Sequence, residues 1–289
     1  MKSIFKGTGV ALVTPFKKEK IDYENLEKII ELDIQKQAKA IVILATTGEG
    51  TTISFEEKKQ MIKFCKNLIG DRAKLVVGTG NNNFDLCLKQ TKLARDLGAD
   101  AALVVTPYYN KTTQDGLVQY YQKLAALKFP MIAYNVPART GLMIELSTVE
   151  KLSQNPYIFG IKESTTDITR ITQLCRICRD KIAVYSGEDD LNFLFYCLGA
   201  NGSISVTANL CADKVEQVFQ FVKAEKLEKA RLLQDELSPL NKILFCETNP
   251  IPVKYLMSQN GLIEPDVRMP LVLPTKEHQD VLTDFASKM

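Results

Sequence analysis

The chain has 289 residues, of which 45% are hydrophobic and 25% are charged, as is typical of soluble globular proteins. Its 37 basic and 34 acidic residues give a net charge of +3, a balance that argues against binding to nucleic acid or to an acidic membrane surface. No apolar run approaches the roughly 18 residues of a membrane span, so we expect a cytoplasmic protein without membrane contact.

Short apolar segments alternate with helical patterns along the first 210 or so residues. The apolar segments predict strands at 9–14, 40–45, 75–77, 101–105, 131–134, 158–161, 182–185 and 203–206. The first helix is expected to begin at Asp22, and Ser54 with Glu57 and Ser147 with Glu150 have the spacing of capping boxes. Regular alternation of this kind predicts a parallel sheet, and eight strands predict an α/β fold of the TIM-barrel type, (β/α)₈.

The strand pattern ends near residue 213. The rest of the chain has helical patterns, with a break at Asn249-Pro250-Ile251-Pro252. We therefore expect residues 1–224 to form a catalytic barrel and residues 225–289 to form a small C-terminal helical subdomain.

Cysteine and histidine usage excludes several kinds of site. The seven cysteines are an odd number and lie mostly in apolar segments, which indicates reduced thiols and no disulfide framework. Cys175 and Cys178 have the spacing of a metal or redox pair, but no second pair follows them. His278 is the single histidine, so a multi-histidine metal site is excluded, and we expect no bound metal.

Lys162 lies at the end of the apolar run Ile158-Phe159-Gly160-Ile161. A neutral lysine amine attacks a ketone carbon to give an imine, and burial favours the neutral form of an amine. A lysine at a strand end can also extend its charged group to water with no chemical role. The position is thus a candidate nucleophile, because a barrel carries its chemistry at the carboxyl ends of its strands.

The other predicted strand ends are rich in hydroxyl groups: Thr14, Thr46-Thr47, Thr79, Thr106, Tyr108-Tyr109, Tyr134, Ser186 and Thr207. Carboxylates and histidines do not cluster among them, which argues against a metal enzyme or a two-carboxylate glycosidase. Hydroxyls beside an amine suit imine chemistry, because carbinolamine formation and collapse each move a proton. Taken alone, Tyr134 also fits a packed tyrosine, and Arg139 fits either a surface residue or a clamp for a carboxylate.

Four motifs occur in order: Thr46-Thr47-Gly48-Glu49, Tyr134-Asn135-Val136-Pro137, Gly160-Ile161-Lys162-Glu163 and Gly202-Ser203-Ile204-Ser205. Together they resemble the dihydrodipicolinate synthase / N-acetylneuraminate lyase family, from about Gly9 into the C-terminal tail. The resemblance implies that Lys162 is the nucleophile that forms a Schiff base with pyruvate or a related 2-oxo acid. It implies no metal and no organic cofactor, since the lysine itself supplies the electron sink.

The resemblance also implies the proton carriers. Tyr134 is expected to donate and accept protons, linked through Thr46 to Tyr109. Because the family usually builds tetramers from tight dimers, Tyr109 is expected to come from a neighbouring subunit of a homotetramer.

Further residues are implied to bind the substrates. Thr47 would hold the pyruvate carboxylate, Arg139 would position the carboxylate of L-aspartate semialdehyde, and Gly187 and Ile204 would contribute backbone groups. Arg139, two residues after the Tyr134 motif, resembles the branch of the family that joins these two substrates to give 4-hydroxy-tetrahydrodipicolinate in lysine and diaminopimelate biosynthesis.

Two other functions stay open. One is a class I aldolase that cleaves N-acetylneuraminate or a 2-keto-3-deoxy sugar acid with the same lysine, and Arg139 separates this alternative from the synthase. The other is a barrel that binds an oxo acid without catalysis, against which the intact Lys162, Tyr134 and Thr46 argue.

One departure from the family concerns regulation. Relatives that L-lysine inhibits carry histidines and a glutamate where this chain has Phe55, Lys58 and Leu86, although Asn82 and Tyr108 are kept. Loss of the acidic partner removes a charge-assisted contact for an incoming ammonium group. We therefore expect weak or absent inhibition by L-lysine.

Overall fold

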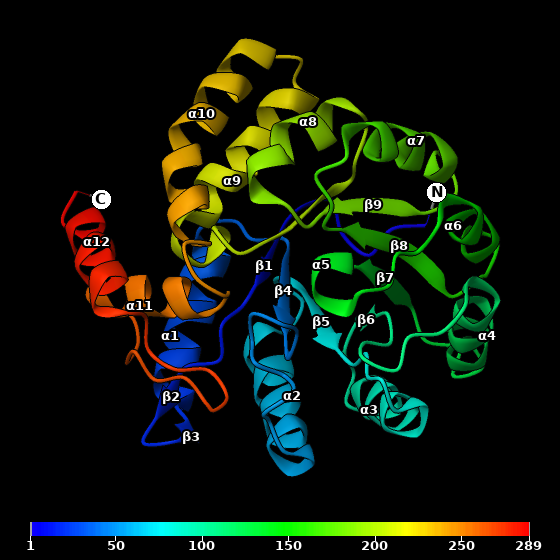
Figure 1. Cartoon of the computed structure of the whole chain (residues 1–289), viewed down its shortest axis with the longest axis horizontal. Helices are drawn as coiled ribbons and strands as arrows, with labels where there is room; N and C mark the ends of the chain where they lie inside the picture. The colour runs from blue at the N-terminus through cyan, green and yellow to red at the C-terminus, as the bar shows by residue number, and fades with distance from the viewer. Residues whose placement is uncertain (1, 289) are drawn as a thin grey trace.

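Eight parallel strands close into a barrel at the centre of this computed structural model, which describes residues 2–288 (Figure 1). The strands are β1 (Gly7–Ala11), β4 (Ala40–Ile43), β5 (Lys74–Gly78), β6 (Ala101–Val105), β7 (Met131–Asn135), β8 (Ile158–Glu163), β9 (Ala183–Ser186) and β10 (Gly202–Ser205). The barrel closes because β1 pairs with both β4 and β10. The predicted (β/α)₈ barrel is confirmed.

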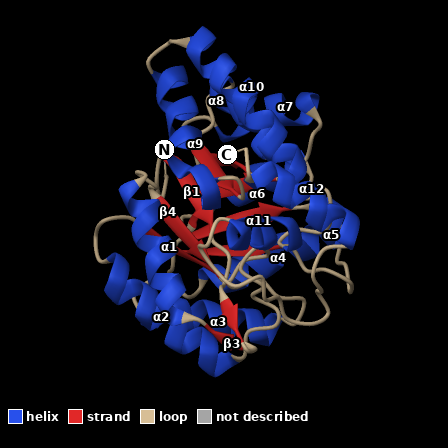
Figure 2. Ribbon diagram, turned by 90° about the vertical axis from the view of Figure 1, so that its left-hand side faces the viewer, coloured by secondary structure: helices blue, strands red, loops and turns tan. Residues whose placement is uncertain are grey.

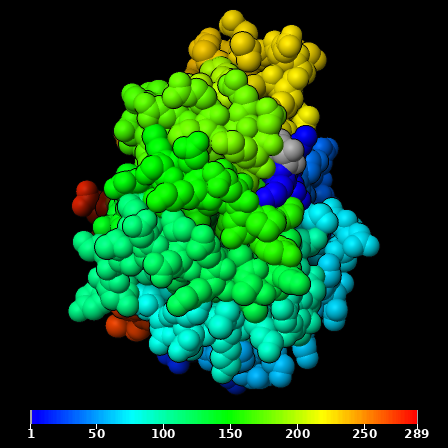
Figure 3. All heavy atoms as spheres, turned by 90° about the vertical axis from the view of Figure 1, so that its right-hand side faces the viewer, coloured from blue at the N-terminus to red at the C-terminus, as the bar shows by residue number. Residues whose placement is uncertain are grey.

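Helices surround the strands on the outside of the barrel (Figure 2). They are α1 (Tyr23–Gln35), α2 (Phe55–Ile69), α3 (Phe84–Asp96), α4 (Gln114–Ala125), α6 (Leu146–Ser153), α7 (Ile168–Cys178), α8 (Asn192–Cys197) and α9 (Ala208–Lys223). The one-turn helix α5 (Pro137–Thr140) and the short 3₁₀ helix η1 (Asp189–Leu191) lie in the connections that follow β7 and β9. Side chains of α3, α4, α6 and α7 cover one side of the molecule, coloured from cyan to green (Figure 3). Because the strands are covered outside and filled inside, they read as continuous apolar runs.

Most predicted helix starts agree with the structure. Asp22 caps α1, and the capping box of Ser54 and Glu57 opens α2. The capping box predicted at Ser147 and Glu150 is wrong, because α6 begins at Leu146 without a side-chain cap. Instead, the Gln114 side chain accepts a hydrogen bond from the Glu145 backbone N–H at 3.1 Å, so a tertiary contact satisfies this end of the helix.

The C-terminal part contains α10 (Leu227–Ile243), α11 (Ile251–Gln259) and α12 (Lys276–Ala286). The expectation of a helical tail with one break was wrong for residues 260–275, which lie outside helices. Three prolines in this segment, Pro265, Pro270 and Pro274, disfavour a continuous helix. We propose that the barrel ends at the turn between α9 and α10, which places the domain boundary at residues 224 and 225.

Arg268 ties this irregular segment to the barrel. Its guanidinium donates to the Glu57 carboxylate at 2.5 Å and to the Glu19 backbone carbonyl at 2.6 Å. The segment therefore lies against the start of α2, and a small hairpin formed by β2 (Phe16–Lys17) and β3 (Lys20–Ile21) is nearby. Among the helices of residues 2–288, none combines the length and the apolar character needed to cross a bilayer.

The Glu57 carboxylate gives a test of this contact. Its hydrogen bond to Arg268 is the main cause that lowers the pKa of Glu57 from 4.5 to about 2. Since the folded pKa is lower than the unfolded one, the ionised carboxylate stabilises the fold above about pH 4.5, and this stabilisation is lost as the pH falls toward 2. Glu57→Gln keeps a capping-box side chain but does not titrate.

We therefore expect the melting temperature of the wild type to fall more between about pH 5 and pH 3 than that of Glu57→Gln. Glu56→Gln, in the same helical turn, is the control, because Glu56 makes long contacts at the surface, at 3.8 Å with Lys59 and at 3.5 Å with Gln60. Parallel melting curves of wild type and Glu57→Gln across this pH range would contradict the assignment.

Candidate active site

The pairing of β7 with β8 places Tyr134 directly beside Lys162 in the sheet. Lys162 is the penultimate residue of β8, and it is only 5% exposed. Its Nζ lies 4.4 Å from the centroid of the Tyr134 ring. The predicted nucleophile is therefore buried at the carboxyl end of a core strand, next to the hydroxyl-bearing ring that the sequence singled out.

A buried polar network connects β7 and β8 on the outer side of the barrel. The Glu163 carboxylate accepts hydrogen bonds from Asn135 Nδ2 at 2.7 Å and from Arg170 at 3.0 Å. Burial raises the pKa of Glu163, and the Arg170 charge and the Asn135 hydrogen bond oppose that rise. Each of Asn135 and Glu163 directly follows a site residue, so the network fixes the backbone on which Tyr134 and Lys162 stand.

Gly187, the residue after β9, lies against Lys162. A Cβ atom at this position would lie 2.7 Å from Lys162 Cε and 2.1 Å from the Ser164 hydroxyl oxygen. Any larger residue would therefore push the lysine out of place. The Gly187 carbonyl accepts a hydrogen bond from the Ser164 hydroxyl at 3.2 Å.

The loop after β4 carries Thr46 and Thr47. The Thr14 hydroxyl donates to the Gly48 carbonyl at 2.7 Å, which fastens the loop to the segment that follows β1. Glu49 forms a 2.6 Å ion pair with Lys254 of α11, and both side chains are buried. The buried Thr47 hydroxyl accepts a hydrogen bond from Asn249 Nδ2 at 3.0 Å. The loop is thus held from the barrel on one side and from the C-terminal segment on the other.

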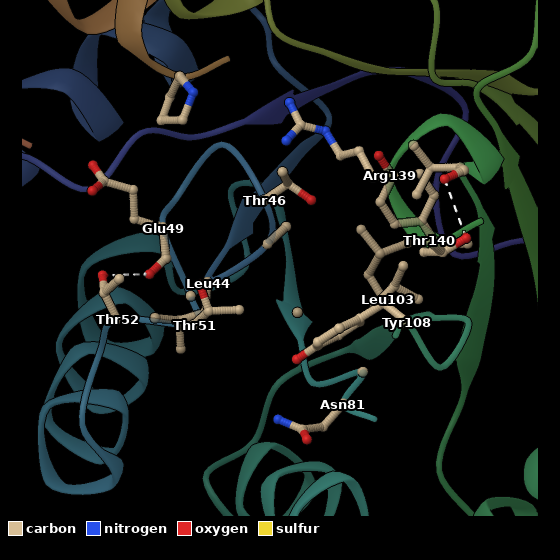
Figure 4. A pocket seen from close by; sticks show the side chains of 18 of the residues that line it. Leu44, Thr46, Glu49, Thr51, Thr52, Asn81, Leu103, Tyr108, Arg139 and Thr140 are labelled. Atoms are coloured by element: carbon tan, nitrogen blue, oxygen red, sulfur yellow. Dashed lines mark hydrogen bonds between the residues drawn. The ribbon is translucent and has the colours of Figure 1, made fainter. Parts of the chain in front are cut away.

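A cavity of about 290 Å³ opens at the carboxyl ends of the strands. Thr46, Tyr134, Arg139 and Asn249 line one part of it. Figure 4 shows the Arg139 side chain extending toward the loop that carries Thr46. Arg139 lies on the one-turn helix α5, and its Nη2 donates to the Asn249 backbone carbonyl at 3.0 Å.

The predicted proton relay of Tyr134, Thr46 and Tyr109 is not connected by hydrogen bonds among residues 2–288 of one chain. Tyr134 and Thr46 line the same cavity, but no hydrogen bond links them among residues 2–288. Tyr109 is 92% exposed and has a positive φ of 69°. Ile204 is buried in β10, where it pairs with Gly9.

Two residues of this region were missed by the sequence reasoning. Asn249 was noted only as part of a break between helices. Glu188 follows Gly187, and burial and the negative charges of Asp189 and Asp190 raise the pKa of Glu188 to about 7, while the positive charge of Lys162 opposes the rise. A carboxyl that titrates near neutral pH can exchange protons with its surroundings.

A second part of the cavity is lined by Lys58, Asn81, Gln90 and Tyr108. Lys58 is 8% exposed, and burial lowers its pKa. No group of three or more histidine, cysteine, aspartate or glutamate side chains that could hold a metal ion occurs within residues 2–288.

Comparison with known proteins gives consistent matches over nearly the whole chain. The model of the dihydrodipicolinate synthetase family matches residues 4–289. The 4-hydroxy-tetrahydrodipicolinate synthase of Thermodesulfovibrio yellowstonii is 44% identical over 282 residues, which cover 97% of each chain.

Solved structures also match this chain over nearly its whole length. Dihydrodipicolinate synthase from Aquifex aeolicus superposes with a TM-score of 0.96 at 38% identity, covering 98% of both chains. The chloride-inhibited dihydrodipicolinate synthase from Acinetobacter baumannii, in complex with pyruvate, superposes with a TM-score of 0.95 at 41% identity and the same coverage.

The buried network beneath the site predicts a large effect of one substitution. Arg170→Met leaves the Glu163 carboxylate buried without its cationic partner, which typically costs about 3–5 kcal/mol. We expect urea denaturation to show a loss of this size. Arg176→Met, on the exposed side of the same helix, is the matched control.

Adding Glu163→Gln to Arg170→Met removes the uncompensated charge, so the double variant should recover part of the lost stability. A stability of Arg170→Met equal to that of Arg176→Met would show that the network does not hold the two strands.

Proposed function

Because the chain belongs to the dihydrodipicolinate synthetase family, we propose that it is a lyase that condenses pyruvate with L-aspartate semialdehyde to give 4-hydroxy-tetrahydrodipicolinate, in lysine and diaminopimelate biosynthesis. The observation that carries this proposal is the buried Lys162 amine, 4.4 Å from the Tyr134 ring centroid at the mouth of the barrel. A desolvated amine is a competent nucleophile toward a ketone.

The first half-reaction takes place on Lys162. Its neutral amine attacks the ketone carbon of pyruvate, and loss of water from the carbinolamine gives a protonated imine. The imine withdraws electrons, so a methyl proton is lost and an enamine forms. The Thr47 hydroxyl and the backbone amides of its loop hold the pyruvate carboxylate.

The second half-reaction joins the two substrates. The enamine carbon attacks the aldehyde carbon of L-aspartate semialdehyde and regenerates an imine. The amino group of this substrate then attacks the imine carbon, closes the ring and displaces Lys162. Arg139 positions the carboxylate of the semialdehyde, and its place on the cavity wall supports this role. Gly187 and Ile204 contribute backbone groups beside the bound pyruvate.

Proton transfer needs a group that both gives and takes a proton, and we assign this role to Tyr134. Thr46 links it to Tyr109 of a neighbouring subunit. The 92% exposure of Tyr109 supports this assignment, because an aromatic side chain that leaves its own chain is available to another. We propose a homotetramer built as a dimer of dimers.

The proposed chemistry uses the covalent imine in place of a metal or an organic cofactor. Both substrates are small oxo compounds, and we propose that the enzyme acts in the cytoplasm without a nucleic-acid or membrane partner. The aldolase and the non-catalytic barrel have no specific observation in their favour.

Lys162→Ala gives the direct test. We expect the variant to keep its fold and lose nearly all turnover of pyruvate and L-aspartate semialdehyde, measured through a coupled reductase, because the proposed imine forms on the Lys162 amine. Lys229→Ala, at an exposed position on α10, should retain wild-type turnover.

Borohydride reduction with pyruvate should add a stable mass to wild type and to Lys229→Ala, but not to Lys162→Ala. A folded Lys162→Ala sample with normal rates would disprove the mechanism. A pyruvate adduct without turnover of the semialdehyde would still support imine formation on Lys162, but it would favour a sugar-acid aldolase over the synthase.

Regulation by L-lysine is expected to be weak or absent. Lys58 would place a cation next to the ammonium group of the ligand, and neither Phe55 nor Leu86 offers a negative charge. A relative that L-lysine inhibits is assayed in parallel. At lysine concentrations that fully inhibit the relative, the initial rate of this protein should stay nearly constant. Leu86→Glu is expected to increase the sensitivity, and strong inhibition of the wild type would contradict this reading of the cavity.

A further inference from the structure

Asn249 lies between two side chains that are proposed to hold different substrates. It is 5% exposed and precedes α11, more than 100 residues from either partner in the chain. Its side-chain amide donates to Thr47 Oγ1 at 3.0 Å, and its backbone carbonyl accepts from Arg139 Nη2 at 3.0 Å. One residue of the C-terminal part thus contacts both Thr47 and Arg139.

The direction of the hydrogen bond to Thr47 has a chemical consequence. An amide NH₂ group only donates, whereas a hydroxyl both accepts and donates. Once Thr47 Oγ1 accepts from Asn249, the Thr47 hydrogen is free to be donated elsewhere. Hydrogen bonds in such a chain also polarise one another, so the Thr47 hydroxyl becomes a better donor.

A substrate carboxylate has only acceptor atoms. A threonine hydroxyl binds it well when no protein group has taken up its hydrogen, and Asn249 lines the cavity at the mouth of the barrel. We infer that Asn249 is a positioning residue that orients the Thr47 hydroxyl as a donor to the pyruvate carboxylate. This inference rests on the proposed function, because it takes pyruvate as the molecule that Thr47 binds.

The surroundings keep Asn249 in place. Glu49 of the Thr47 loop is paired with Lys254 on the first helix after Asn249, and the Glu49 carboxylate also accepts from the Arg268 backbone N–H at 2.9 Å. These contacts fix the loop and the C-terminal segment relative to each other. The Asn249 amide can therefore act on Thr47 at a constant distance.

The test measures pyruvate binding without the second substrate. Wild type and variants are incubated with increasing pyruvate, reduced with borohydride and analysed by mass spectrometry for the adduct on Lys162. For Asn249→Ala, loss of one hydrogen bond should raise the half-saturating pyruvate concentration by about five- to tenfold. The KM for the semialdehyde should be unchanged, because the backbone carbonyl that holds Arg139 remains.

Asn249→Asp separates orientation from packing. Aspartate has nearly the same shape but only accepts when ionised, so it would draw the Thr47 hydrogen toward itself and away from the substrate. The half-saturating concentration should rise more in Asn249→Asp than in Asn249→Ala. If Asn249→Ala melts at a much lower temperature than wild type, the inference is tested on Asn249→Asp alone, because this variant preserves the shape of the side chain. Asn67→Ala, at an exposed position on α2, is the control and should match wild type.

Dependence on Thr47 completes the experiment. In a Thr47→Val background, Asn249→Ala should have no further effect on pyruvate binding, while Thr47→Ser should keep the full effect of Asn249→Ala. Additive effects in Thr47→Val, or an unchanged half-saturating concentration in both Asn249 variants, would overturn the inference alone. Failure of the wild type to form any pyruvate adduct would instead overturn the proposed function.

Discussion

The pairing of β7 with β8 is the constraint on which the whole site depends. It sets Tyr134 opposite Lys162, so the amine and the ring are brought together by backbone hydrogen bonds and not by flexible side chains. Side chains alternate across a strand, so the next residue on each strand, Asn135 and Glu163, points outward into a network completed by Arg170. The inner face is thereby free for chemistry, while the outer face supplies rigidity.

The C-terminal part is a second source of order at the mouth of the barrel. Barrel strands end in loops, and loops are the most mobile parts of a domain. Here the loop of Thr47 and the short helix of Arg139 both receive contacts from Asn249, and Glu49 is paired with Lys254. Residues outside the barrel therefore restrain the groups that the barrel presents.

Local patterns predicted most of the fold, because a few consecutive residues determine each strand and most helix caps. The apolar run before Lys162 made it a candidate nucleophile, and their positions at or after a strand end made Tyr134 and Arg139 candidates. Their expected roles, and that of Thr46, came from a family resemblance. The helical tail was wrong at residues 260–275 although the prolines there are a local signal, but the other failures involve partners far apart in the chain. Gln114 replaces the cap expected at Ser147, and Asn249 meets Thr47 across 202 positions, a contact that no local pattern encodes. Exposure of Tyr109 was likewise visible only in three dimensions.

The buried ion pair of Glu49 and Lys254 also bears on how the molecule unfolds. Both charges lie in the interior, where burial lowers the pKa of Lys254, and the Lys254 amine also lies 4.2 Å from the centroid of the Phe16 ring. Detaching the tail would separate this pair and also break the hydrogen bond from the Arg268 backbone N–H to Glu49, and the loss of a buried ion pair is strongly unfavourable. The barrel and the tail consequently share one cooperative transition, and a tail exchanged from a relative must supply the matching cation to be compatible with this barrel.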